Sequence, residues 1–232
     1  MLEGRYDCKP AVINSNIVVV GGFNNTNKVL YSVEQFKQNE KSWVYKTEIP
    51  DKRTHFCICS FKRNLYMLGG RYDNFQTLRS CFVYNMKYER WTKIADMNEH
   101  RKCAACTVYE SSIVVTGGGN KRRLKSVEAY DYYENKWTNL PCMIEERRSP
   151  ASVSAGNKLF IVGGFQNSSC EIFDSSSRQF SYIKTISYLN DISCFQAVSV
   201  SNRLIVFVTV LESIQKSLLT MLKHKTENMF VV

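Results

Sequence analysis

An arginine recurs along the chain at positions 5, 53, 101 and 147, and each copy stands 16 residues before a Gly-Gly pair. A guanidinium group is planar and binds a carboxylate through two parallel hydrogen bonds. Further basic and aromatic residues lie in the turns and in the segments that follow the glycines, and such groups suit a short acidic peptide. The predicted peptide-binding residues are Arg5, Phe23, Arg53, His55, Arg71, Tyr72, Phe75, Arg101, Arg122, Arg147 and Phe165.

The same arginines have a second possible role, which is a salt bridge or turn contact inside the repeat. A residue that is fixed by internal repetition can serve the repeat itself rather than a ligand. Acidic side chains at Asp73, Glu99, Glu145 and Glu146 lie in the same segments and weaken the positive field. Both roles stay open on the sequence alone.

Other patterns that resemble reactive sites are weak. Cys103-x-x-Cys106 has no second ligand pair, and in the expected strand its sulfurs point to opposite faces, which is typical of core cysteines. The histidines, at positions 55, 100 and 224, have no partnered serine or cysteine at a meaningful spacing. The glycines at 117–119 continue the end of a strand and are not followed by Lys-Ser/Thr at the spacing of a phosphate loop. We expect no enzyme activity, no metal and no cofactor.

The composition is that of a folded globular chain. It has 232 residues, 44% of them hydrophobic and 12% aromatic, and a net charge of +10. Apolar runs are shorter than the ~18 to 20 residues that cross a bilayer, and no export signal opens the sequence, so we expect a cytoplasmic protein with reduced thiols and no membrane partner. The basic balance raises nucleic acid as a partner, but the charge is spread widely and only 121–125 forms a dense cluster, so that partner is unlikely.

A repeat of about 48 residues organises the chain. The Gly-Gly pairs follow one another in steps of 48, 48 and 46, and each pair ends a run of strand formers. An aromatic residue comes later in each unit, and a second large ring always lies seven residues beyond it. These ring pairs are Phe36 with Trp43, Tyr84 with Trp91, Tyr130 with Trp137, and Phe173 with Phe180. With a short strand of small residues before the glycines, each unit is predicted to form four strands.

The repeat resembles the kelch repeat, in which a strand and Gly-Gly precede a Ser-Val-Glu strand, a Trp and an Arg-bearing turn. Ser32-Val33-Glu34 and Ser126-Val127-Glu128 carry the resemblance, which extends from residue 5 to about 209. It implies an all-β kelch β-propeller over 1–210, with four full four-stranded blades plus a partial fifth. The implied repeats span about 5–51, 53–99, 101–146 and 147–190, with the partial blade at 194–210. The fourth departs by having Phe180 in place of Trp, and the fifth lacks both glycines and the arginine.

The segment 211–232 changes its pattern to apolar residues at helical spacing, at positions 211, 214, 218 and 222. A short C-terminal helix is predicted there, outside the kelch repeats. It would cover the edge of the partial blade or bind a partner, and the first role is favoured because an open edge strand needs cover.

The segment between the glycines and the third strand varies in length, with 14, 14, 12 and 9 residues from the second glycine to the aromatic. Variable loops on a rigid scaffold are where recognition is usually placed. The resemblance implies a single protein-binding face built by these loops, in the substrate-recognition part of a cullin-RING ubiquitin ligase adaptor. Cullin would be reached only through a BTB domain, which together with a BACK domain would have to precede residue 1. The alternative is an actin- or cytoskeleton-binding kelch protein.

Overall fold

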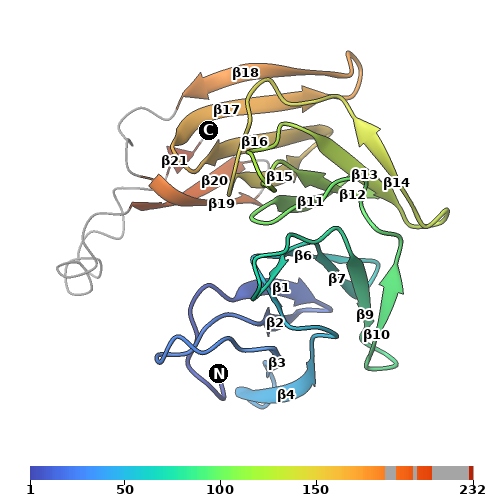
Figure 1. The fold of residues 1–232 in the computed structure, drawn as a ribbon, viewed down its shortest axis with the longest axis vertical. Helices are drawn as coiled ribbons and strands as arrows, with labels where there is room; N and C mark the ends of the chain where they lie inside the picture. The colour runs from blue at the N-terminus through green and yellow to red at the C-terminus, as the bar shows by residue number, and fades with distance from the viewer. Residues whose placement is uncertain (186–191, 201–202, 211–229, 232) are drawn as a thin grey trace. The chain divides into compact units, whose positions relative to one another are not determined.

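The computed structural model describes residues 1–185, 192–200, 203–210 and 230–231, and the predicted repeats appear in it as antiparallel sheets (Figure 1). The chain divides into two compact units. Unit 1 contains Met1–Lys102 and Asp131–Trp137, and unit 2 contains Cys103–Tyr130 and Thr138–Val232. The division therefore falls within the third repeat.

The first two repeats each form a four-stranded sheet whose strands pair in chain order. The first sheet contains β1 (Lys9–Ile13), β2 (Asn16–Val20), β3 (Ser32–Lys37) and β4 (Ser42–Glu48). The second sheet contains β6 (Cys57–Phe61), β7 (Asn64–Leu68), β9 (Cys81–Asn85) and β10 (Arg90–Ile94). The second repeat also contains a short ribbon that the sequence did not predict, in which β5 (Arg53–Thr54) pairs with β8 (Arg71–Tyr72).

The third and fourth repeats have the same strand order. The third sheet contains β11 (Ala105–Tyr109), β12 (Ser112–Thr116), β13 (Val127–Asp131) and β14 (Lys136–Leu140). The fourth contains β15 (Ala151–Ala155), β16 (Lys158–Gly164), β17 (Asn167–Asp174) and β18 (Gln179–Thr185). Four strands in each of the four repeats were predicted, and the sheets confirm them.

The partial fifth repeat is a hairpin of β19 (Ile192–Val200) and β20 (Arg203–Val210), to which β21 (Phe230–Val231) adds a third strand. The helix predicted from residue 211 falls on 211–229 and 232, which lie outside the described residues, while Phe230–Val231 is a strand. The described residues contain no helix long and apolar enough to cross a membrane.

The constant seven-residue interval between rings has a simple cause. Phe36 faces Trp43 directly across β3 and β4, and their ring centroids are 5.3 Å apart. Tyr84 and Trp91 face each other in the second sheet at 5.2 Å, a separation at which aromatic rings attract. In the fourth sheet Phe180 pairs with Phe173 at 5.0 Å. Phe180 therefore replaces the tryptophan without changing the strand register.

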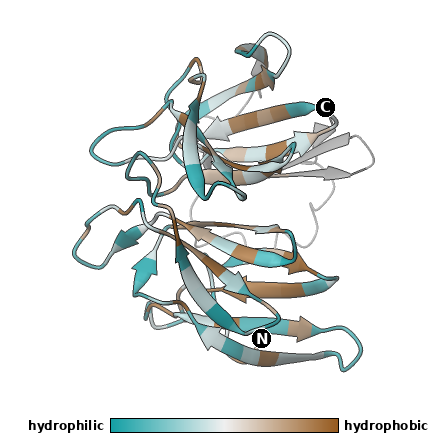
Figure 2. Ribbon diagram, turned by 90° about the vertical axis from the view of Figure 1, so that its right-hand side faces the viewer, coloured by the Kyte–Doolittle hydropathy of each residue, from teal (hydrophilic) through white to brown (hydrophobic). Residues whose placement is uncertain are grey.

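Each unit has its own apolar core, and hydrophobic residues follow the strands while the connecting turns are mostly hydrophilic (Figure 2). In unit 1 the core joins the first two sheets through the side chains of Val18, Val33, Phe56, Leu65 and Met67, among others. In unit 2 the core joins the third and fourth sheets through Val114, Val127, Leu159, Ile161 and Phe173.

The glycine pairs are required by a close approach of two backbones. Gly69 has φ +62, and a Cβ atom there would lie 2.4 Å from the carbonyl oxygen of Arg101. That carbonyl accepts a hydrogen bond from the amide of Gly70 at 2.7 Å. In unit 2, Gly117 likewise lies against the Arg147 carbonyl, to which Gly118 donates at 2.8 Å. The glycines of one repeat thus receive the arginine-bearing segment of the next.

Gly69→Ala is expected to lower the free energy of unfolding by about 1 to 3 kcal/mol more than Gly156→Ala does, because the added methyl group overlaps the Arg101 carbonyl. Gly156 is a matched control, since its φ is +58 and no atom lies within 4 Å of the position that a Cβ atom would take there. Urea denaturation of the two variants measures the difference. Equal destabilisation would mean that backbone strain alone requires the glycine.

Candidate functional site

The side chain of Arg147 lies wholly inside the fourth repeat and is fully bonded there. Its Nη1 donates to the carbonyl oxygens of Gly163 and Ser169 at 2.8 and 2.7 Å. Its Nη2 donates to Ser169 Oγ at 2.6 Å and to Glu171 Oε1 at 2.7 Å. Neither the Arg147 nor the Glu171 side chain is exposed to solvent. We call this set of a guanidinium group, a glycine carbonyl, a serine and an acid the arginine clamp.

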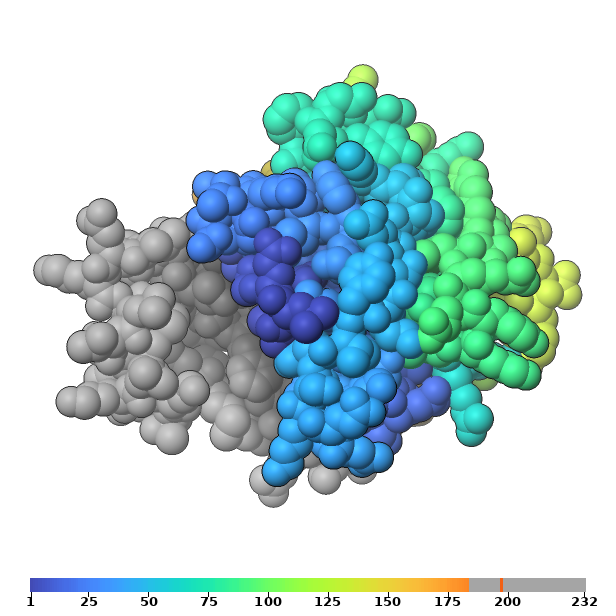
Figure 3. Space-filling model, turned by 90° about the horizontal axis from the view of Figure 1, so that it is seen from below, coloured from blue at the N-terminus to red at the C-terminus, as the bar shows by residue number. Residues whose placement is uncertain are grey.

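Arg5 forms the same arginine clamp in the first repeat. Its side chain is unexposed, and it donates to the Gly21 carbonyl at 3.0 Å, to Ser32 Oγ at 3.0 Å and to the Glu34 carboxylate. The other oxygen of Glu34 accepts the backbone N–H of Leu2 at 2.8 Å. The N-terminal residues, darkest blue in Figure 3, lie at the surface of this repeat. The buried glutamate therefore fixes the segment that carries the arginine as well as the arginine itself.

The second repeat keeps the clamp with a different acid. Arg53 is 0% exposed and donates to the Gly69 carbonyl at 2.8 Å and to Ser80 Oγ at 2.8 Å. Phe82 occupies the position of Glu34 and Glu171, and the guanidinium carbon of Arg53 lies 5.1 Å from the centre of its ring. The carboxylate of Asp51 instead accepts from both Nε and Nη2 of Arg53. A bidentate aspartate thus takes over the role of the buried glutamate.

The turn arginines therefore have the repeat-internal contacts that the sequence left open as their second role. Arg101 is also buried, at 1% exposure, and its backbone bonds to Gly70 and Leu78. The buried glutamates, and the acids two residues before Arg53, Arg101 and Arg147, were missed as partners of these arginines. Ligand contact by Arg5, Arg53, Arg101 and Arg147 stays a prediction.

Glu145 extends the clamp of the fourth repeat towards solvent. Its carboxylate accepts hydrogen bonds from Ser169 at 2.8 Å and Tyr182 at 3.0 Å, and also from Asn167. Burial acts to raise the pKa of Glu145, but the bonds from these side chains and the charge of Arg147 outweigh it and hold that pKa below its ordinary value. These contacts therefore favour the ionised form of the Glu145 carboxyl group.

In the second repeat, the loop after the glycines is an ordered hairpin. Arg71 pairs with Thr54 in the ribbon, and its Nε donates to His55 Nδ1 at 3.3 Å. The hydroxyl of Tyr72 donates to the Asp51 carboxylate at 3.2 Å, and burial, followed by the charge of Asp51, raises the pKa of Tyr72. Four of the predicted residues, Arg53, His55, Arg71 and Tyr72, are thus brought together here.

The first repeat has an equivalent loop with different chemistry. Tyr6 and Phe23 pair as an isolated bridge, and their rings stack with centroids 5.5 Å apart. The hydroxyl of Tyr6 donates to the side-chain oxygen of Asn27 at 2.6 Å. Phe23 is therefore half-buried by its own repeat, and Tyr6, which was not predicted as a binding residue, is its exposed neighbour.

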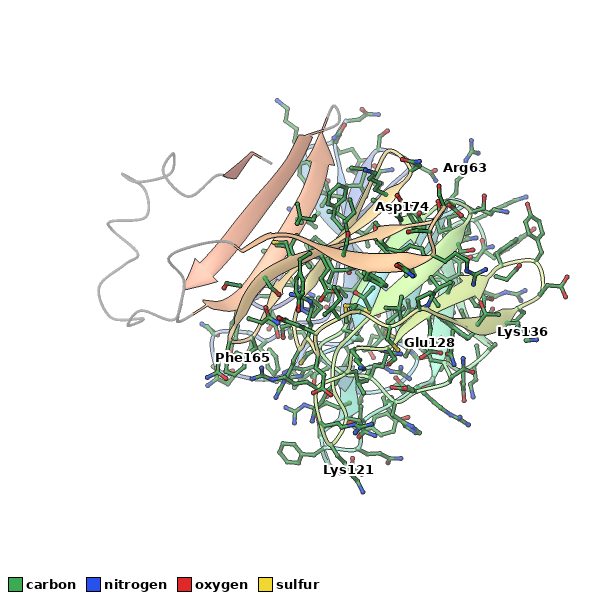
Figure 4. The ribbon with its side chains drawn as sticks, turned by 90° about the horizontal axis from the view of Figure 1, so that it is seen from above. Arg63, Lys121, Glu128, Lys136, Phe165 and Asp174 are labelled. Carbon is green, nitrogen blue, oxygen red and sulfur yellow. The ribbon has the colours of Figure 1, made fainter. Side chains whose placement is uncertain are left out.

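In unit 2 the loops of the third and fourth repeats contact each other. Arg123 Nη2 donates to the side-chain oxygen of Gln166 at 2.9 Å, and its guanidinium group lies 5.8 Å from the centre of the Phe165 ring. Lys121 and Arg122 are exposed at the tip of the same loop. Figure 4 shows Lys121 and Asp174 on opposite sides of this unit, with Glu128 between them. The predicted residues Arg122 and Phe165 therefore belong to one local surface, together with Arg123.

The described residues contain no group of three or more His, Cys, Asp and Glu side chains that could hold a metal ion. Cys106 lies in β11, but Cys103 precedes that strand and has φ +52, so the expectation that both belong to one strand was wrong. The turn after the arginine imposes this backbone, since His55 and Ser149 have the same conformation two residues after theirs.

Comparison with known proteins gives a consistent match. The family model described as the KLHDC2/KLHL20/DRC7 Kelch-repeats domain matches residues 8–208. Kelch-like protein 41b of Danio rerio is 33% identical over 153 residues, which are 66% of this chain and 25% of that protein. Kelch-like protein 38 of Rattus norvegicus is 27% identical over 178 residues, 76% of this chain and 30% of that protein. The chain thus spans about a quarter to a third of the length of these relatives.

The solved structure of YjhT has a TM-score of 0.74 to this chain at 15% sequence identity, and the match covers 87% of this chain and 72% of that one. This similarity, with the four-stranded sheets, confirms the predicted all-β kelch propeller fold.

Arg147→Ala is expected to lower the free energy of unfolding by about 3 to 5 kcal/mol, because it leaves the buried Glu171 carboxylate without its cation. Arg148→Ala removes the exposed neighbouring arginine and is expected to change stability by less than about 0.5 kcal/mol. Thermal and urea denaturation measure both variants. Unchanged stability in Arg147→Ala would contradict a structural role for this arginine and favour its predicted contact with a ligand.

Asp51→Asn is expected to cost about 1 to 3 kcal/mol of stability, because Arg53 loses its ionised acceptor. Adding Phe82→Glu places an acid where the first and fourth repeats have theirs, so the double variant is expected to be more stable than Asp51→Asn alone. Phe82→Gln in the same background is the neutral control and is expected to recover less. A double variant no more stable than Asp51→Asn would show that position 82 does not reach Arg53.

Proposed function

The chain belongs to the KLHDC2/KLHL20/DRC7 Kelch-repeats domain family, and on that premise we propose that its post-glycine loops bind an acidic segment of a partner protein. The post-glycine loops are the segments between each glycine pair and the third strand of its repeat. They include the predicted residues Phe23, Arg71, Tyr72, Phe75, Arg122 and Phe165. The clamp arginines bond to carbonyl groups at the ends of these loops, and their own contact with a ligand stays a prediction.

One observation carries the proposal: in each unit, a post-glycine loop places an arginine against an aromatic ring. Arg71 lies 4.6 Å from the centre of the Phe75 ring in unit 1, and Arg123 lies 5.8 Å from that of Phe165 in unit 2. A guanidinium group held on a ring keeps its N–H donors at the edge, where they can bind a carboxylate. The ring beside it supplies apolar contact area at a low cost in conformational entropy.

The distribution of charge supports an acidic ligand. In the clamps of the first, second and fourth repeats the guanidinium charge is balanced by a carboxylate that is directly bonded to it. Lys121 and Arg122, by contrast, are exposed at the loop tip. The chain as a whole carries +10, so its field also attracts acidic segments over a longer range.

Within a longer kelch-like protein, we propose that this domain is the substrate-recognition part of a cullin-RING ubiquitin ligase adaptor. Because the chain corresponds to only 25% of the length of the Danio rerio relative, binding to cullin would belong to other parts of such a protein. The alternative function is binding to actin. Co-sedimentation of the chain with actin filaments at physiological salt distinguishes the two functions. An adaptor domain would stay in the supernatant.

Selection of short random peptides displayed on phage against the chain is expected to enrich sequences rich in Asp and Glu. Arg122→Glu is expected to weaken the selected peptides by roughly three- to tenfold, and added salt to weaken them further, because like charge repels and exposed charges are screened. Arg63→Glu, an exposed arginine in the β6–β7 turn, is the control with the same charge change. An equal loss in both variants, or no acidic preference, would contradict a defined acidic-peptide site.

A further inference from the structure

Phe75 stands at the tip of the post-glycine loop of the second repeat, in an unusual backbone conformation. The amide of Phe75 donates to the Tyr72 carbonyl at 3.0 Å, and the amide of Tyr72 donates to the Gln76 carbonyl at 3.0 Å. These bonds close a tight hairpin with Phe75 at φ +67, in the left-handed region. The residue is 70% exposed. Both the backbone and the exposure are unfavourable for a large apolar residue.

The first repeat shows that the hairpin itself does not require phenylalanine. Asn27 lies 48 residues before Phe75, has φ +61, and donates from its amide to the Asn24 carbonyl at 3.0 Å. The amide of Asn24 donates to the Lys28 carbonyl at 3.0 Å, as Tyr72 does to Gln76. Asparagine tolerates the left-handed conformation well, whereas phenylalanine does not. The second repeat thus keeps the hairpin but has a residue that destabilises it.

Among the described residues that have a positive φ and are not glycine, Phe75 is the only one with a large apolar side chain. Its ring contacts Arg71, and no other aromatic ring packs on it in the described part of the chain. Packing in a hydrophobic core therefore does not explain why position 75 is a phenylalanine. A strained, exposed side chain that the fold does not need is typical of a binding site.

Arg71 lies beside the Phe75 ring and has nitrogen atoms available for a hydrogen bond. Its Nε is occupied by His55, but its two terminal nitrogens make no hydrogen bond or ion pair within the described residues. The ring of Phe75 and two N–H-bearing nitrogens therefore lie side by side at one loop tip. Asp73 in the same turn is the opposing charge, and its carboxylate accepts from the Tyr31 hydroxyl at 3.5 Å.

We propose that Phe75 and Arg71 form a two-part anchor, which recognises a large apolar side chain next to a carboxylate in the bound segment. The apolar side chain would cover the Phe75 ring, and the carboxylate would bind the terminal nitrogens of Arg71. This inference rests on the proposed function and deepens it, because it adds an apolar requirement to an acidic one. On this proposal, Phe75 serves binding and lowers the stability of the folded chain.

The experiment uses the chain with the phage-displayed peptides described above and three variants. Phe75→Asn installs the residue of the first repeat, is expected to raise the melting temperature by about 2 to 4 °C, and is expected to weaken peptide binding at least about tenfold. Arg71→Gln is expected to reduce the preference for a carboxylate while the apolar preference stays. Tyr133→Asn removes another exposed ring, in the β13–β14 turn, and is expected to leave binding unchanged.

The outcomes separate the anchor from the proposed function. If the wild-type chain selects acidic peptides and Phe75→Asn binds them equally well, the anchor is wrong while the acidic site stands. If Phe75→Asn lowers the melting temperature, Phe75 is a structural residue and the anchor is also overturned. If the wild-type chain selects no acidic peptide, both the proposed function and the anchor fail.

Discussion

A buried guanidinium group bonded within its own repeat is the interaction on which the rest of this structure depends. An unpaired buried cation would cost several kcal/mol, so the clamp requires an acid, a serine and a glycine carbonyl at fixed places. The glutamate of the third strand supplies the acid in the first and fourth repeats, and Asp51 supplies it in the second. In the second repeat Phe82 stands where the other repeats have the glutamate, and Asp51, which lies outside the strands, accepts from Arg53 instead. The arginine therefore needs a carboxylate partner more than it needs that partner at one position.

The arginines inside the repeats and those in the post-glycine loops have different environments. The clamp arginines are unexposed, whereas the post-glycine loops carry exposed side chains such as that of Phe75. There the same residue type has the opposite environment, because Arg71 and Arg123 lie on rings near solvent instead of among carbonyl groups. A repeated arginine in a sequence can therefore belong to the scaffold, while arginines outside the repeat pattern, such as Arg71 and Arg123, lie in the loops.

Much of the fold could be predicted from the sequence because its signals are periodic. The glycine pairs located the second strand of each repeat, and the seven-residue interval between rings located a cross-strand pair such as Phe36 and Trp43. The direction of the arginine side chains could not be predicted, since spacing alone does not distinguish inward from outward. The sequence signal that could have found the partner is the acid two residues after the serine of the third strand, as in Ser32-Val33-Glu34. The ribbon of β5 and β8 has two residues per strand, too few to show alternation.

The clamp holds the post-glycine loop at both of its ends, and this has a consequence for how the family can diversify. Arg53 bonds to the carbonyls of Gly69 and Ser80, whereas Arg147 bonds to those of Gly163 and Ser169, across a much shorter segment. The two anchor points stay the same while the chain between them changes in length, and lengthening a loop between fixed ends costs little free energy. Insertions there can change the length and composition of an exposed loop without disturbing the sheets, as in the hypervariable loops of an antibody framework.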